Sequence, residues 1–194
     1  MDIISALKSE LFRPLIILFI PGVTASSPYA LLLGHYIPQV KFFRESQPSA
    51  FVVIITICAL AVGLILEDVG SRIEVGWDKL LKKQDATHEE NWNNYLRLKL
   101  KDEIVGQRYL QTFLTRMKFE LSMAPALILF SIGLFWLNWV YSISVCASLT
   151  ITVVVLGLAA YLLWESYSSA QVLSNTRKQI IKAMKKTPIK HEMD

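Results

Sequence analysis

The chain has 194 residues, of which 53% are hydrophobic, a mean hydropathy of +0.41 and a formal net charge of +4. Ordinary soluble domains contain roughly 45 to 50% apolar residues, and here the excess lies in long runs without charge. These features argue against a soluble two-domain enzyme. They predict an all-α integral membrane protein with about four transmembrane helices and a helical cytoplasmic domain.

Four uncharged stretches are long enough to cross a bilayer, because a spanning helix needs about 20 mainly apolar residues. They are Pro14 to Gln39, Ser49 to Leu66, Leu121 to about Leu137, and about Ser142 to Trp164. The short segment 138–141 joins the last two and predicts a tight helical hairpin. The chain thus divides into two N-terminal transmembrane helices (1–66), a cytoplasmic helical loop domain (67–120), a transmembrane hairpin (121–164) and a basic amphipathic cytoplasmic tail (165–194).

The middle of the first span contains prolines and small polar residues. Because proline removes a backbone donor, this segment predicts a kinked or partly unwound helix. Unwound backbone at this depth lines a pore or binds a ligand. Alternatively, Gly22 and Ser26 only allow close helix packing, as Ala59 and Gly63 would in the second span. The segment is marked by Pro21, Gly22, Ser26, Ser27 and Pro28.

Basic residues are distributed unequally between the two faces of the membrane. Eighteen of the 20 lie in the N-terminal segment, the long loop or the tail, and only Lys41 and Arg44 lie on the opposite face. Since basic residues are retained in the cytoplasm, this bias predicts a multi-pass protein of the cell inner membrane with both termini cytoplasmic. A signal peptide ending near Ala25 is the alternative.

The loop 67–120 carries ten basic and ten acidic residues. We expect the second span to continue as a helix toward Leu81, and a further helix to begin at His88 behind a capping box of Thr87 and Glu90. Alternating leucines at 96–101 leave a short strand open as an alternative to helix.

The residue pattern of the tail predicts a basic amphipathic helix, with Leu173, Ile180, Ile181 and Met184 on its apolar face. Its basic residues are expected to contact anionic lipids of the inner leaflet. These residues are Arg177, Lys178, Lys182, Lys185 and Lys186.

Charged residues gather at the cytoplasmic edge of the membrane and form the candidate site, a charge switch or ion pair. Glu67 follows an apolar run directly, where an ionised carboxylate is costly, and Arg116 is its expected partner. The simpler alternative is a set of helical pairs four residues apart. The site comprises Glu67, Asp68, Arg72, Arg116 and Glu120.

Paired carboxylates at this edge also suit a metal or acid–base chemistry, which would make the chain an enzyme acting on lipid headgroups. No cofactor or metal is expected, because the three histidines are scattered and no nucleotide-binding, hydrolase or nucleic-acid motif is present. We therefore favour a non-enzymatic protein.

The layout of several spans with a charged cytoplasmic part resembles small multi-helix transmembrane effectors of bacterial antiphage systems of the retron type, in architecture rather than in any motif. This resemblance implies an effector that disturbs membrane integrity when triggered, as in abortive infection. It further implies a homo-oligomer and a cytoplasmic protein or nucleoprotein regulator bound through residues 67–120. An immunity or assembly factor that binds another membrane protein is a third interpretation.

Overall fold

The computed structural model describes residues 3–84, 105–142 and 144–186. No strand occurs in these ranges, which confirms the predicted all-α class. The capping box, the helix expected from His88 and the alternation at 96–101 lie outside them. The helices are α1 (Ile3–Tyr36), α2 (Pro38–Ser46), α3 (Pro48–Gln84), α5 (Val105–Tyr141) and α6 (Val145–Lys186).

Four helices of the described part, α1, α3, α5 and α6, are long and apolar enough to cross a membrane. The 37 residues of α3 correspond to about 55 Å at roughly 1.5 Å per residue, whereas the hydrocarbon core is about 30 Å thick. The helices therefore continue well beyond the bilayer. As expected for α3, the charged segment after its span continues the same helix, and in α5 the charged residues before the span belong to the spanning helix too.

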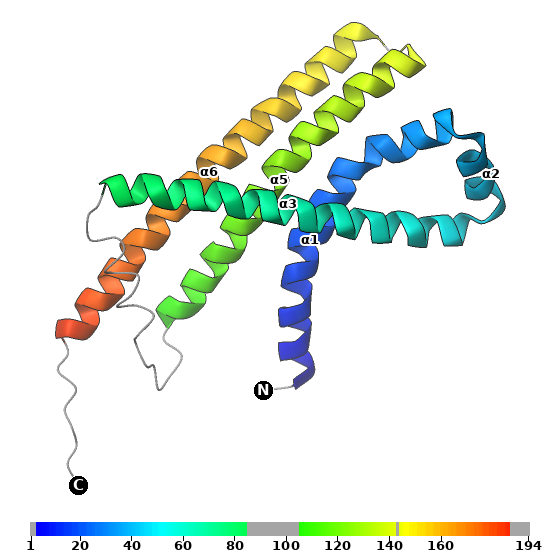
Figure 1. Cartoon of the computed structure of the whole chain (residues 1–194). Helices are drawn as coiled ribbons and strands as arrows, with labels where there is room; N and C mark the ends of the chain where they lie inside the picture. The colour runs from blue at the N-terminus through cyan, green and yellow to red at the C-terminus, as the bar shows by residue number, and fades with distance from the viewer. Residues whose placement is uncertain (1–2, 85–104, 143, 187–194) are drawn as a thin grey trace.

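The helices form two hairpins that diverge from a common region (Figure 1). One consists of α1, α2 and α3, and the other of α5 and α6. The tips of both hairpins, α2 and the turn after Tyr141, lie at one end of the molecule, here called the hairpin end. The opposite parts of α3, α5 and α6, residues 67–84, 112–120 and 165–181, carry the charged residues and are called the charged end.

Two boundaries differ from the sequence-based expectation. Segment 138–141, expected to connect two spans, is the last turn of α5, and the turn falls at Ser142, whose φ of 49° is left-handed. The hairpin end also contains α2, which hydropathy does not indicate. The sequence feature that marks α2 is a pair of prolines. Pro38 and Pro48 each occupy the first turn of a helix, where the missing amide proton costs nothing, so they mark the start of α2 and the start of α3.

Helix α1 is α-helical throughout the segment expected to be kinked or partly unwound, and its axis changes direction where it crosses α3 (Figure 1). The helix is thus bent but not unwound. Pro28 leaves the carbonyl of Thr24 without an amide donor. The hydroxyl of Ser27 donates to that carbonyl at 3.1 Å, and Ser26 donates to the carbonyl of Gly22 at 2.7 Å. Side-chain hydroxyls thus stabilise a helix that two prolines would weaken.

The same segment packs against both neighbouring helices. A Cβ atom at Gly22 would overlap the carbonyl oxygen of Ala59, and one at Gly63 would overlap that of Leu18, so the backbones of α1 and α3 are in direct contact. Pro21 and Pro28 are fully buried. The contacts of residues 21–28 are therefore those of the close-packing alternative.

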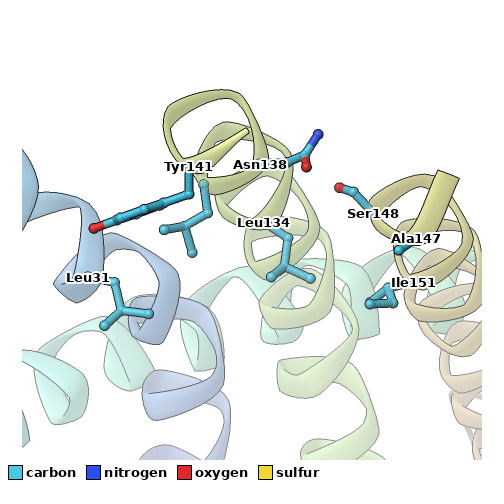
Figure 2. A pocket seen from close by; sticks show the side chains of 8 residues that line it. Leu31, Leu134, Asn138, Tyr141, Ala147, Ser148 and Ile151 are labelled. Carbon is cyan, nitrogen blue, oxygen red and sulfur yellow. The ribbon is translucent and has the colours of Figure 1, made fainter. Parts of the chain in front are cut away.

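At the hairpin end, aromatic residues connect α1 to α5. The hydroxyl of Tyr29 donates to the carbonyl of Leu129 at 2.9 Å, and the indole of Trp136 donates to the hydroxyl of Tyr36 at 3.2 Å. Beside them a groove lies between α1, α5 and α6 (Figure 2). Helix α1 thus contacts α3 through small residues and α5 through small and aromatic ones.

Candidate functional site at the charged end

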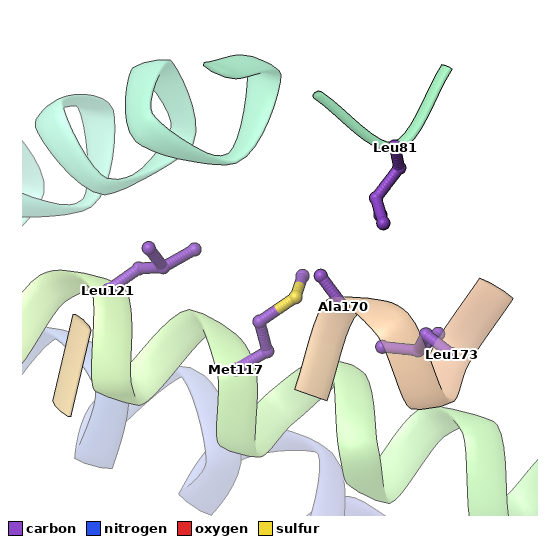
Figure 3. Packing of buried hydrophobic residues seen from close by; sticks show 5 residues of the cluster. All are labelled: Leu81, Met117, Leu121, Ala170 and Leu173. Carbon is purple, nitrogen blue, oxygen red and sulfur yellow. The ribbon is translucent and has the colours of Figure 1, made fainter. Parts of the chain in front are cut away.

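An apolar core joins the three helices of the charged end. One buried cluster contains Leu81 of α3, Met117 and Leu121 of α5, and Ala170 and Leu173 of α6 (Figure 3). This core lies among residues expected to form a loop domain and a free tail. It is the reason that the three extensions stay together beyond the spans.

Trp77 attaches α3 to α6. Its indole nitrogen donates to the hydroxyl of Ser166 at 3.2 Å, and its ring meets the ring of Tyr167 edge to face at 5.3 Å. The Ser166 hydroxyl in turn donates to the carbonyl of Leu163 at 2.8 Å. A polar residue fully buried in α6 is thereby satisfied, and α3 is fixed in position above it.

Arg116 links α5 to α6 through two carboxylates. Its Nε lies 2.8 Å from Glu120 and its Nη2 lies 2.5 Å from Glu165. The side chain of Glu120 is only 5% exposed, and its second oxygen accepts a hydrogen bond from Ser169 at 3.3 Å. A nearly buried carboxylate is thus held by two donors, which offsets its desolvation.

The remaining predicted site residues lie elsewhere. The sequence predicted a pair of Glu67 and Arg116, but Arg116 faces α6 and not α3. Glu67 Oε1 instead lies 4.0 Å from Lys118 Nζ. Asp68 and Arg72 pair at 3.0 Å along α3, and both are largely exposed. Only the pair of Arg116 and Glu120 combines burial with a contact between helices.

At the described charged end, Glu67, Glu74 and Lys118 border a depression between α3 and α5 that leaves no space for even a water molecule. Among the described residues, no group of three or more His, Cys, Asp or Glu side chains could hold a metal ion.

The described part of the tail is the continuation of α6. Leu173 and Ile181 are buried, and Ile180 packs on the core of the charged end. The apolar face of the tail therefore contacts α3 and α5. Arg177 and Lys178 are half-buried, and the side chains of Lys182, Lys185 and Lys186 lie outside the described set.

Sequence reasoning missed the two residues that connect the pair of Arg116 and Glu120 to α6. Glu165 and Ser169 are four apart, so they lie on one face of a helix, but each is 49 residues from its partner on α5. Only the antiparallel hairpin brings them together.

Four apolar helices in two hairpins, joined by a charged three-helix end, define a multi-pass α-helical membrane protein. No family model, curated protein or solved structure matches the chain.

Proposed function

We propose that this chain is a non-enzymatic effector of the bacterial inner membrane, which disturbs membrane integrity when its charged end is triggered. The activity would arrest an infected cell, as in abortive infection. The observation that carries the proposal is the small part of the spanning surface that the chain itself covers. Of the most apolar stretch of 18 residues in each helix, 17% is buried inside the chain in α3 and 6% in α6.

Surface of this kind must be covered by lipid or by further copies of the chain. Four helices are too few to enclose a wide channel, so loss of membrane integrity requires a homo-oligomer. In the proposed orientation the charged end faces the cytoplasm, where a protein or nucleoprotein regulator reaches residues 67–120 and anionic lipids reach the basic residues of α6.

The charged end is suited to transmit a trigger because its three helices continue into the spans without a break. Arg116 holds α5 to α6 by ion pairs at the membrane edge. Because Arg116 is half exposed, a ligand can compete for it, and its release would allow the spans of α5 and α6 to separate from that end.

The test is membrane potential and entry of an impermeant dye in bacteria after induced expression. We would compare the intact chain with Arg116→Gln, which removes the ion pairs, and with Lys79→Gln, an exposed charge change on α3. Depolarisation by Arg116→Gln, earlier than by the other two, supports the proposal. If all three accumulate in the membrane and potential and growth stay normal, the effector function is wrong.

A further inference from the structure

The groove at the hairpin end is an open space between helices of the described part of the chain. It has a volume of about 290 Å³ and lies over α5, between α1 and α6. Leu31, Leu134 and Ile151 line its inner part (Figure 2). This volume is near the lower limit of small-molecule sites, roughly 300 Å³, and suits part of one hydrocarbon chain.

The groove changes in polarity along its length. Its polar side chains, Asn138 and Ser148, face each other from α5 and α6 nearer the hairpin end (Figure 2). Leu134 lies one turn deeper, about 6 Å at 1.5 Å per residue. Tyr141 stands at the rim, and Trp139 is largely exposed nearby, which places the polar part at the depth of the aromatic belt.

One polar atom of the groove is buried without a partner. Asn138 Oδ1 accepts no hydrogen bond from any described residue, although it is out of contact with solvent. Such an acceptor costs free energy until a donor reaches it. A ligand that is apolar toward the bilayer centre and donates a hydrogen bond at headgroup depth would satisfy this acceptor once the Asn138 amide turns toward the groove.

We propose that this groove binds a glycerophospholipid of the surrounding membrane, with an acyl chain along Leu134 and Ile151 and a hydrogen-bond donor of its headgroup on Asn138. Lipid is the occupant because the groove lies between helices that span the membrane. Its inner part is apolar and its outer part is polar, which matches the acyl chain and the headgroup of a lipid. Headgroups with a hydroxyl or an ammonium, such as phosphatidylglycerol and phosphatidylethanolamine, satisfy Asn138. Phosphatidylcholine, which has no donor, does not.

The experiment is native mass spectrometry of the full chain, extracted from vesicles that hold equal amounts of phosphatidylglycerol and phosphatidylcholine of the same acyl chains. We expect one retained lipid per chain and about a fivefold preference for phosphatidylglycerol, the effect of a single hydrogen bond. Asn138→Leu should keep the retained lipid but lose the preference.

A matched pair of variants tests the location. Ile151→Trp fills the groove, whereas Leu149→Trp introduces the same side chain at an exposed site of α6 outside it. Only Ile151→Trp should lose the retained lipid. Equal lipid retention by both variants overturns the site, and equal retention of the two lipids by the intact chain overturns the headgroup assignment. A lipid-free dimer of the intact chain that Ile151→Trp converts to monomer would also overturn the proposal, since a second copy would then occupy the groove.

Discussion

At the scale of single residues, Gly63 tests the contact between α1 and α3. Gly63→Ala places a methyl group against the backbone of Leu18, which cannot move away as a flexible side chain would. Overpacking of this kind costs about 1 to 3 kcal/mol. We expect a lower midpoint of thermal unfolding of the purified chain in detergent.

The control is Gly157→Ala on α6, where an added Cβ meets nothing within 4 Å. Its midpoint should stay unchanged or rise slightly, because alanine favours helix over glycine by about 1 kcal/mol. If the two variants unfold at the same temperature, α1 and α3 do not approach as closely as described.

Glu120 and Asp68 are both acidic partners of an arginine four residues away, but they differ in burial. Glu120→Gln should reduce the free energy of unfolding by about 1 to 3 kcal/mol, since a charged hydrogen bond is lost in a nearly buried place. Asp68→Asn removes a solvated pair and should change it by less than about 0.5 kcal/mol. Denaturant titration of both variants gives the comparison, and a larger effect at Asp68 would contradict the described burial.

At the scale of elements, Trp77 connects the end of α3 to α6. Trp77→Ala removes the aromatic contact with Tyr167 and the bond to Ser166, so this end of α3 should separate from α6. Hydrogen exchange at residues 73–84 is expected to accelerate at least tenfold, while exchange in the spans stays unchanged. Val75→Ala, at an exposed position on the same helix, is the control and should exchange as the intact chain does.

Uncharged runs predicted the spanning helices because the bilayer imposes a simple length requirement. Packing was harder to predict, since lipid-facing and protein-facing positions are both apolar, and periodicity then does not identify the buried face. The prolines of α1 indicated a kinked or partly unwound helix, and α1 changes direction without unwinding, with Ser27 donating to the carbonyl that Pro28 leaves without an amide donor. Leu173 was expected on the apolar face of the tail, but its partners on α3 and α5 could not be predicted from the sequence. The pair of Arg116 and Glu120 followed from spacing alone, but its contacts on α6 depend on the hairpin.

At the scale of the whole molecule, both hairpin tips lie at one end and the charged parts of α3, α5 and α6 at the other (Figure 1). The excess of basic residues at the charged end leads us to predict that this end is cytoplasmic. Single cysteines at exposed positions can test this, at Glu45 on α2 and at Lys79 on α3. The natural cysteines, Cys58 and Cys146, would first be replaced by alanine, because both are exposed on the described helices.

A membrane-impermeant maleimide applied to intact cells should label Glu45→Cys, because α2 is then outside the cytoplasm. Lys79→Cys should react only after the membrane is permeabilised. The permeabilised sample is the control, since it shows that each cysteine can react. If Lys79→Cys is labelled in intact cells and Glu45→Cys is not, the orientation is reversed. Residues 67–120 would then face away from any cytoplasmic regulator, and the trigger in the proposed function would have to act from the other side of the membrane.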